Sequence, residues 1–97
     1  MSRPVDDGST FRRWLEANPL RSWRRRRGLS AARAGELCGV SPMSVFFWER
    51  GCRPSASSVA KLARGMRTTP IALRRRWREW HEAADGGARR EEVSVGR

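Results

Sequence analysis

The feature that most constrains this chain is a set of three polar–proline pairs, each followed by a long stretch without proline. The pairs are Asn18-Pro19, Ser41-Pro42 and Thr69-Pro70. In such a pair the polar side chain accepts an unpaired backbone N–H at the start of a helix, and proline stands where the missing N–H does no harm. Each pair therefore predicts a helix that begins at its proline.

Further capping and stop signals complete a helical pattern. Ser30 and Ser55 are two more capping residues, and glycines 28, 39 and 51 stand where helices would end. We expect a short leading helix near 10–17 and five further helices over approximately 19–27, 30–38, 42–50, 55–66 and 70–84. No strand pattern persists, so the predicted fold class is all-α: a compact five-helix domain with an extra short N-terminal helix.

The length of the chain allows one domain. With 97 residues and 38% hydrophobic content, the single core is thin, and a dimer partner would help to stabilise it. Residues 1–8 and 85–97 are rich in Gly, Ser and charge, so both ends are predicted to be flexible. The predicted domain therefore spans 9–84.

The charge of the chain is strongly positive, and the excess lies in the part expected to fold. Lys and Arg total 21 against 10 Asp and Glu, which gives a net charge of +11. Residues 19–53 carry eight basic and two acidic residues, and residues 54–82 carry seven and two, whereas both ends are neutral. A basic folded surface favours a polyanionic partner. Nucleic acid is the first expectation, and an anionic membrane surface is the weaker one.

Several classes of function are not supported by the sequence. No apolar run approaches the roughly 18 residues of a membrane span, and we expect no signal peptide. Cys38, Cys52 and His81 are too few for a zinc site, and no catalytic constellation or phosphate-cradling loop is visible. We therefore expect a non-enzymatic protein without metal or cofactor, located in the cytoplasm with the nucleoid, or in the host cytoplasm if a phage encodes it.

Residues 29–51, LSAARAGELCGVSPMSVFFWERG, resemble the helix-turn-helix of the Cro/repressor (XRE) family. Gly35 takes the small-residue position between the two helices, and Gly39-Val40-Ser41 forms the turn. Other positions that match the family outside this turn are Leu20, Trp23, Val45, Trp48, Pro54, Ser55, Leu62, Ala63 and Met66. The resemblance covers about residues 20–66.

The resemblance implies a transcriptional regulator that binds double-stranded DNA. Residues 30–38 would be the second helix of the family, and 42–50 the recognition helix in the major groove. A small bacterial or phage repressor, bound as a dimer to a pseudo-palindromic operator, is the specific expectation. The resemblance also implies an ion pair between Arg24 and Glu49 that joins the first helix to the end of the recognition helix.

Helical periodicity indicates which face of helix 42–50 is free. Val45, Trp48 and Glu49 fall on the inner side. The candidate base-facing residues are Pro42, Met43, Ser44, Phe46, Phe47 and Arg50. The candidate phosphate contacts are Arg21, Arg25, Arg27, Arg33, Ser41 and Arg53. The family often has Gln, Arg or Ser at base-reading positions, because such side chains hydrogen-bond to base edges, whereas Met and Phe can only touch apolar groups such as the thymine methyl.

This departure leaves alternatives open. Met43 and Phe47 could read thymine methyls, with DNA shape adding specificity. The same apolar face could instead dock on a protein, as in an antitoxin-like or polymerase-docking module. Phe46 and Phe47 could also pack on the N-terminal helix or on a neighbouring subunit. A third reading of the +11 charge is non-specific nucleic-acid binding.

Two further groups of residues have expected roles. Leu73, Trp77 and Trp80 form a narrow apolar seam on the last helix, and we expect it to form the contact of a homodimer. Cys38 is expected to be a small core residue and Cys52 an exposed loop residue, so the two are not expected to pair. No feature of the sequence supports a redox role for Cys52.

Overall fold

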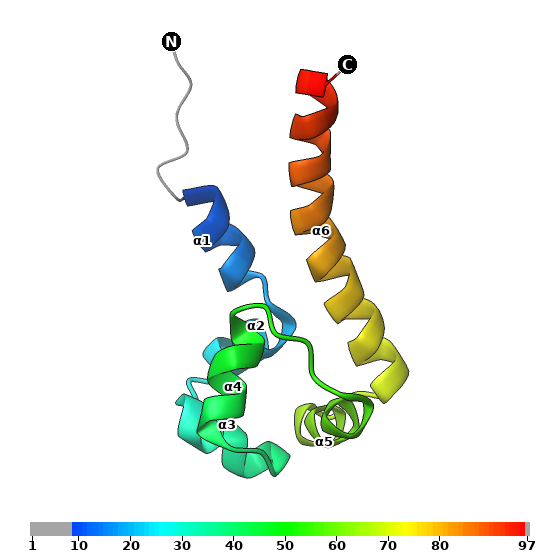
Figure 1. Cartoon of the computed structure of the whole chain (residues 1–97). Helices are drawn as coiled ribbons and strands as arrows, with labels where there is room; N and C mark the ends of the chain where they lie inside the picture. Colours follow the sequence, from blue (N-terminus) through cyan, green and yellow to red (C-terminus); the bar gives the residue numbers. More distant parts are fainter. Residues whose placement is uncertain (1–8, 97) are drawn as a thin grey trace.

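The computed structural model describes the backbone of residues 9–96 and the side chains of residues 10–84. Over that range the chain forms six helices and no strand, as Figure 1 shows. The helices are α1 (Ser9–Glu16), α2 (Pro19–Arg26), α3 (Ala31–Cys38), α4 (Pro42–Glu49), α5 (Ala56–Met66) and α6 (Pro70–Gly96). The predicted all-α fold with an additional N-terminal helix is confirmed.

The helices start at the capping residues that the sequence predicts. The Asn18 Oδ1 accepts hydrogen bonds from the backbone N–H groups of Leu20 and Arg21, each at 2.9 Å. Hydroxyl groups do the same at the next four helices, each accepting from the backbone N–H three residues further on. The capping residues there are Ser30, Ser41, Ser55 and Thr69.

Two helices end in a left-handed residue. Gly39 caps α3 with φ +73°, a conformation that glycine adopts without steric cost. Arg67 caps α5 with φ +61°, and it is the one non-glycine residue with positive φ among those described. The N–H of the next residue, Thr68, bonds to the carbonyl of Ala63 at 2.9 Å, which closes the last turn of α5. The end of α5 is therefore well bonded but carries backbone strain at Arg67.

The core lies where α2, α3, α4, α5 and α6 meet. α3 packs against α4 and α5, and α6 packs against α5, α2 and α1. Leu20, Val45, Leu62 and Leu73 are fully buried at its centre. A Cβ at Gly35 would come within 2.6 Å of the carbonyl oxygen of Val40. This close approach explains why the turn between α3 and α4 needs its smallest residue at position 35.

α1 is held against α6 by a pair of tryptophans. The rings of Trp14 and Trp80 stack with centroids 4.0 Å apart and planes 3° from parallel. Each indole N–H donates to the other residue's backbone carbonyl, at 2.7 Å from Trp14 and 2.6 Å from Trp80. In Figure 1, α1 accordingly lies alongside α6, whose lower end reaches α5.

The last helix is longer than expected. The sequence predicts an end near residue 84, but α6 runs from Pro70 to Gly96. No proline follows Pro70, and Ala88 to Glu92 are strong helix formers, so the two glycines at 86 and 87 weaken the helix without ending it. The flexibility expected for 85–97 stays a prediction, and the expectation for 1–8 falls outside the described residues.

The expectation that Leu73, Trp77 and Trp80 form a dimer contact is wrong. Their side chains are buried within the single chain, with exposed fractions of 0%, 4% and 5%. The apolar seam packs against the same chain, where α5, α2 and α1 cover it. These residues stabilise the fold of one protomer and present no surface to a second copy.

Candidate nucleic-acid interface

α4 has one buried and one exposed face, as the helical periodicity predicts. Val45 is 0% exposed and Glu49 2% exposed, and both face the body of the domain. On the opposite side, Met43 is 60%, Phe47 47% and Phe46 44% exposed. Phe46 and Phe47 therefore do not pack beneath the N-terminal helix. The exposed side of α4, with the arginine that follows it, is the candidate DNA-reading face.

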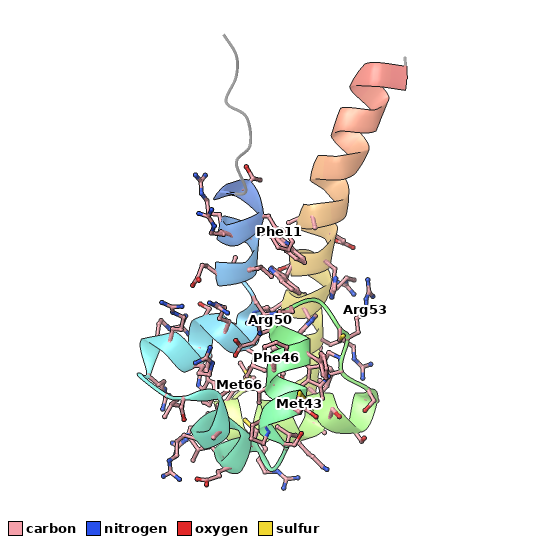
Figure 2. All side chains as sticks on the ribbon, turned by 60° about the vertical axis from the view of Figure 1, so that its left-hand side comes forward. Phe11, Met43, Phe46, Arg50, Arg53 and Met66 are labelled. Atoms are coloured by element: carbon pink, nitrogen blue, oxygen red, sulfur yellow. The ribbon has the colours of Figure 1, made fainter. Side chains whose placement is uncertain are left out.

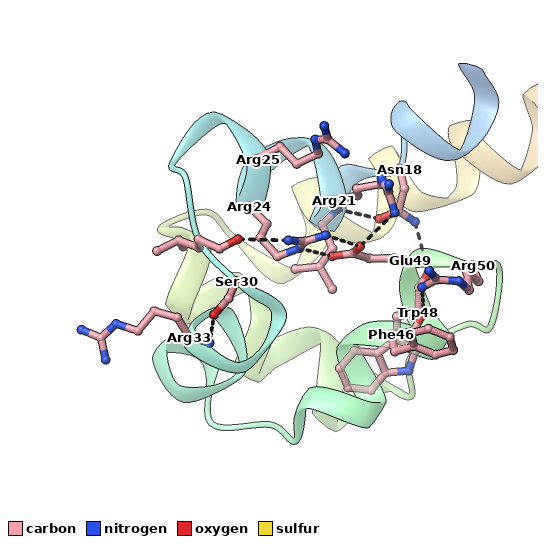
Figure 3. A network of polar contacts seen from close by, with 12 residues as sticks. Asn18, Arg21, Arg24, Arg25, Ser30, Arg33, Phe46, Trp48, Glu49 and Arg50 are labelled. Carbon is pink, nitrogen blue, oxygen red and sulfur yellow. Dashed lines mark hydrogen bonds and ion pairs between the residues drawn. The ribbon is translucent and has the colours of Figure 1, made fainter. Parts of the chain in front are cut away.

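The orientation of α4 is fixed at its end by an ion pair to α2. Arg24 donates to Glu49 through Nε at 2.7 Å and through Nη2 at 3.0 Å, and its Nη1 donates to the carbonyl of Leu29 at 3.0 Å (Figure 3). Hydrogen bonding to Glu49 raises the pKa of Arg24, although burial acts in the opposite direction. This is the pair that the family resemblance implies. All three guanidinium nitrogens of Arg24 donate a hydrogen bond within the fold, two of them to the carboxylate of Glu49.

Asn18 adds a second link to the same end of α4. While its oxygen caps α2, its Nδ2 donates to the backbone carbonyl of Trp48 at 3.1 Å. Asn18 is completely buried. The junction between α1 and α2 therefore contacts the last turn of α4 directly. Arg21 reinforces this region, because its Nη1 lies 3.6 Å from Glu49.

The exposed face of α4 carries an aromatic and cationic cluster. The rings of Phe46 and Phe47 meet edge to face, with centroids 5.5 Å apart. The guanidinium carbon of Arg50 lies 3.7 Å from the centre of the Phe46 ring, and its Nη1 donates to the Phe46 carbonyl at 3.2 Å. Figure 2 shows Met43, Phe46 and Arg50 along this helix. Arg50 is thus held against an aromatic ring beside the apolar surface.

The first turn of α4 offers fewer free polar groups than its sequence suggests. Pro42 and Ser41 are exposed, whereas Ser44 is half-buried. The Ser41 hydroxyl accepts from the N–H of Ser44 at 3.1 Å and donates to its hydroxyl at 3.0 Å. The base-facing role of Ser44 stays a prediction, and a base would have to compete with this local pair.

The arginines predicted to contact phosphate differ in their solvent exposure and in whether they already pair with a carboxylate. Arg21 is only 19% exposed and bonds to Glu16 at 3.1 Å as well as facing Glu49, so it belongs to the ion-pair network. Arg33 pairs with Glu36 at 2.7 Å, and Arg25 lies 3.4 Å from Glu16, but both stay more than half exposed. Arg27 is exposed, with its guanidinium 5.8 Å from the Trp23 ring. Arg53 is exposed on the loop that follows α4 (Figure 2).

The remaining residues of interest have simple environments. Cys38 is buried and Cys52 exposed, and each thiol is free. Burial raises the pKa of Cys38. Among the described residues, no cluster of His, Cys, Asp and Glu could hold a metal ion. No helix in that part of the chain is long and apolar enough to cross a membrane.

A model of the helix-turn-helix domain family matches residues 17–77, well over half of the chain. The chain belongs to the Cro/repressor-type (XRE) helix-turn-helix family. The family binds DNA and is typically non-enzymatic. No curated protein and no solved structure matches the chain at a significant level of similarity. α1 and the part of α6 after Trp77 lie outside the matched residues, so the contact between Trp14 and Trp80 is an addition to the family domain.

Sequence reasoning missed the residues that act across the fold. The sequence indicates only that Asn18 is a cap, because nothing in it shows that the amide reaches Trp48 thirty positions later. It also predicts a phosphate contact for Arg21, whose nearest partners in the structure are Glu16 and Glu49. Only the acidic residue five positions earlier could have signalled that Arg21 has a partner within the chain.

Proposed function

We propose that this chain is a sequence-specific transcriptional regulator, a small bacterial or phage repressor, that reads DNA with the exposed face of α4. The observation that carries the proposal is the contrast in burial between Glu49 and Met43, which lie at opposite ends of α4. Glu49 is buried in the ion pair that fixes α4, whereas Met43 is the most exposed large apolar residue of the same helix. A rigidly held helix with a free outer face is what insertion into the major groove requires.

The chemistry of the face favours thymine-rich half-sites. Met43 and Phe47 can contact thymine methyl groups, and Arg50 beside them can donate to guanine or phosphate oxygens. Arg25, Arg27, Arg33 and Arg53 are the exposed cations that would contact the backbone and set the register. In this account the apolar contacts supply specificity, and the arginines supply most of the salt-dependent affinity.

A double substitution on α4 tests the proposal. Met43→Ala with Phe47→Ala should weaken binding to the preferred duplex by up to about 3 kcal/mol for each apolar side chain whose burial against the bases is lost, while leaving non-specific binding unchanged. Fluorescence anisotropy with the preferred duplex and a scrambled duplex measures both affinities. Phe11→Ala is the control, because Phe11 is also an exposed aromatic residue but lies on α1, away from the face of α4. Equal affinity of the double variant and the control for the preferred duplex would contradict base reading by α4.

The second candidate function is a protein-docking module on the same scaffold. The specific observation in its favour is the apolar character of the face, with Met43, Phe46 and Phe47 each more than two-fifths exposed. A docking protein would keep its DNA behaviour in the double variant and lose its partner. We favour DNA, because Arg50 lies on the Phe46 ring and makes the face cationic as well as apolar.

We propose further that the chain binds as a homodimer. Two copies of α4 would enter successive major grooves about 34 Å apart. Leu73, Trp77 and Trp80 do not contribute to that dimer, since they lie in the core of one protomer. Sedimentation with a half-site and with a full inverted repeat measures the stoichiometry, and one chain per full site would contradict the dimer. A DNA regulator of this kind acts in the cytoplasm, at the nucleoid.

A further inference from the structure

A hollow of about 370 Å³ lies between the start of α5 and the middle of α6, beside the loop that follows α4. Three arginines line it: Arg53 from the loop, and Arg74 and Arg78 from α6. Pro54, Val59 and Trp77 supply apolar lining. The hollow is separate from the exposed face of α4, because none of the candidate base-facing residues lines it.

The positive charge of the hollow is not neutralised within the described part of the chain. Neither Arg53 nor Arg74 has a carboxylate within ion-pair distance there. Arg78 has Glu82 at 3.8 Å, and both side chains are more than three-fifths exposed, so that contact is loose. By contrast, Arg24 bonds to Glu49, and Arg21 bonds to Glu16 and faces Glu49. The arginines of the hollow are thus available to an anion from outside.

The floor of the hollow is apolar. Val59 and Trp77 line it and are each 4% exposed. The Nε1 of Trp77 has no hydrogen-bond partner, but this atom is itself buried, so we assign it no contact with a ligand. A binding site with an apolar body, a few polar groups and a volume in the hundreds of Å³ is typical for small ligands.

We propose that this hollow binds a small organic anion with an apolar body, of the class of aromatic or aliphatic carboxylates and phosphate esters. The arginines bind the charged group of the ligand by charge-assisted hydrogen bonds, and Pro54, Val59 and Trp77 contact its apolar body. A phosphate of the DNA backbone would use the arginines alone and leave the apolar floor uncovered. The floor therefore favours a free ligand over the DNA backbone.

The location of the hollow gives such a ligand a regulatory effect. Arg53 is both a wall of the hollow and a candidate phosphate contact three residues after Arg50. A ligand that engages Arg53 removes a cation from the DNA surface and weakens DNA binding. The proposed ligand site does not depend on the proposed function, whereas the effect of the ligand on DNA binding rests on it.

Nuclear magnetic resonance on the full isotope-labelled chain tests the site. Naphthyl phosphate is the probe, and inorganic phosphate and naphthol are the comparators that lack its apolar body or its charge. We expect naphthyl phosphate to shift the indole N–H resonance of Trp77 in a saturable way, and to leave that of Trp23, which lines no part of the hollow, unmoved. Each comparator should bind at least about tenfold more weakly.

Charge-matched variants separate the site from general attraction to a basic protein. Arg74→Ala with Arg78→Ala should weaken probe binding by about tenfold or more, since each charge-assisted hydrogen bond contributes strongly. Arg64→Ala with Arg75→Ala removes the same charge from exposed positions on α5 and α6 outside the hollow and should leave probe affinity unchanged. An equal loss in both double variants would overturn the proposal, as would the absence of a saturable shift at Trp77.

A separate measurement of DNA binding distinguishes failure of the ligand site from failure of the proposed function. Duplex affinity is measured for each variant as a function of salt, without probe. If the probe does not bind, but Arg74→Ala with Arg78→Ala lowers the salt dependence of DNA binding, the hollow serves the DNA backbone and the small-ligand proposal is wrong. If the probe saturates while the chain fails to bind duplex, the site stands and the proposed function fails.

Discussion

The side-chain amide of Asn18 donates to the backbone carbonyl of Trp48 at 3.1 Å, so the start of α2 holds the end of α4. The contact acts beside the ion pair of Arg24 with Glu49, and the two together attach the last turn of α4 to α2 from two directions. Asn18 also lies two residues after the end of α1, which stacks on α6 through Trp14. The orientation of α4 therefore depends on residues from the first quarter of the chain.

Asn18→Ser tests this attachment. Serine keeps an oxygen that can cap α2 but has no amide to reach Trp48, so the carbonyl of Trp48 keeps only the longer hydrogen bond from the N–H of Gly51, and the smaller side chain leaves space at a fully buried position. We expect the free energy of unfolding, measured by urea denaturation, to fall by about 1–3 kcal/mol. Ser30→Ala, which removes a cap at the exposed start of α3, should cost about 1 kcal/mol. A smaller effect of Asn18→Ser than of Ser30→Ala would contradict the role of the Trp48 contact.

Glu49→Ala should be among the most destabilising single changes. It leaves the guanidinium of Arg24, which is only 17% exposed, without its partner. We expect a loss of about 3 kcal/mol, at the lower end of the range for broken buried pairs because Arg24 still reaches solvent. Glu36→Ala is the control, since its pair with Arg33 is exposed and should matter little. Thermal unfolding of both variants measures the difference, and similar midpoints would contradict the account.

Cys38 should make stability fall at alkaline pH. Burial raises the pKa of its thiol, so the folded state keeps the proton after the unfolded chain has begun to lose it. The contribution is complete below the ordinary thiol range and is lost as pH rises above about 8.5. In a Cys52→Ser background, the free energy of unfolding should drop more between neutral and alkaline pH with Cys38 than with Cys38→Ala. Parallel pH profiles of the two proteins would show that the thiol does not titrate differently on folding.

Arg67→Gly should stabilise the protein. Arg67 has φ +61°, and a left-handed residue with a side chain carries a steric penalty that glycine avoids. After the larger backbone entropy of glycine in the unfolded state is subtracted, a gain of about 0.5–1 kcal/mol is expected. Arg67→Ala removes the same charge but keeps the strain, so it should give no gain. If both variants shifted the unfolding midpoint equally, charge repulsion rather than backbone strain would be the cause.

Local signals predicted much of this fold. Asn18, Ser41 and Thr69 mark helix starts in the sequence, because a capping side chain acts on the backbone two or three residues away. The two faces of α4 also followed from periodicity, since a residue's position around a helix depends only on its place in the sequence. The Gly35 position and the Arg24–Glu49 pair followed from the family resemblance, and the structure gives their physical reasons.

Contacts between distant segments could not be predicted in this way. Periodicity showed that Trp77 and Trp80 form an apolar seam, but an apolar seam is the same whether its own chain or a second copy covers it. The reciprocal hydrogen bonds between Trp14 and Trp80, together with the burial of Trp77 within one chain, decide that question in favour of the same chain. The hollow between Arg53 and Arg74 depends likewise on how α5 and α6 pack, which no local pattern specifies.

We propose that α4 reads DNA sequence, and selection from a random duplex library shows whether it does. At about 150 mM salt, where exposed charges are strongly screened, the full chain should enrich an inverted repeat. We expect its half-sites to lie about one helical turn apart and to be rich in thymine, with the enrichment lost in Met43→Ala with Phe47→Ala. No enriched motif, together with binding that fades steeply as salt rises, would mean that the protein binds phosphate without reading bases.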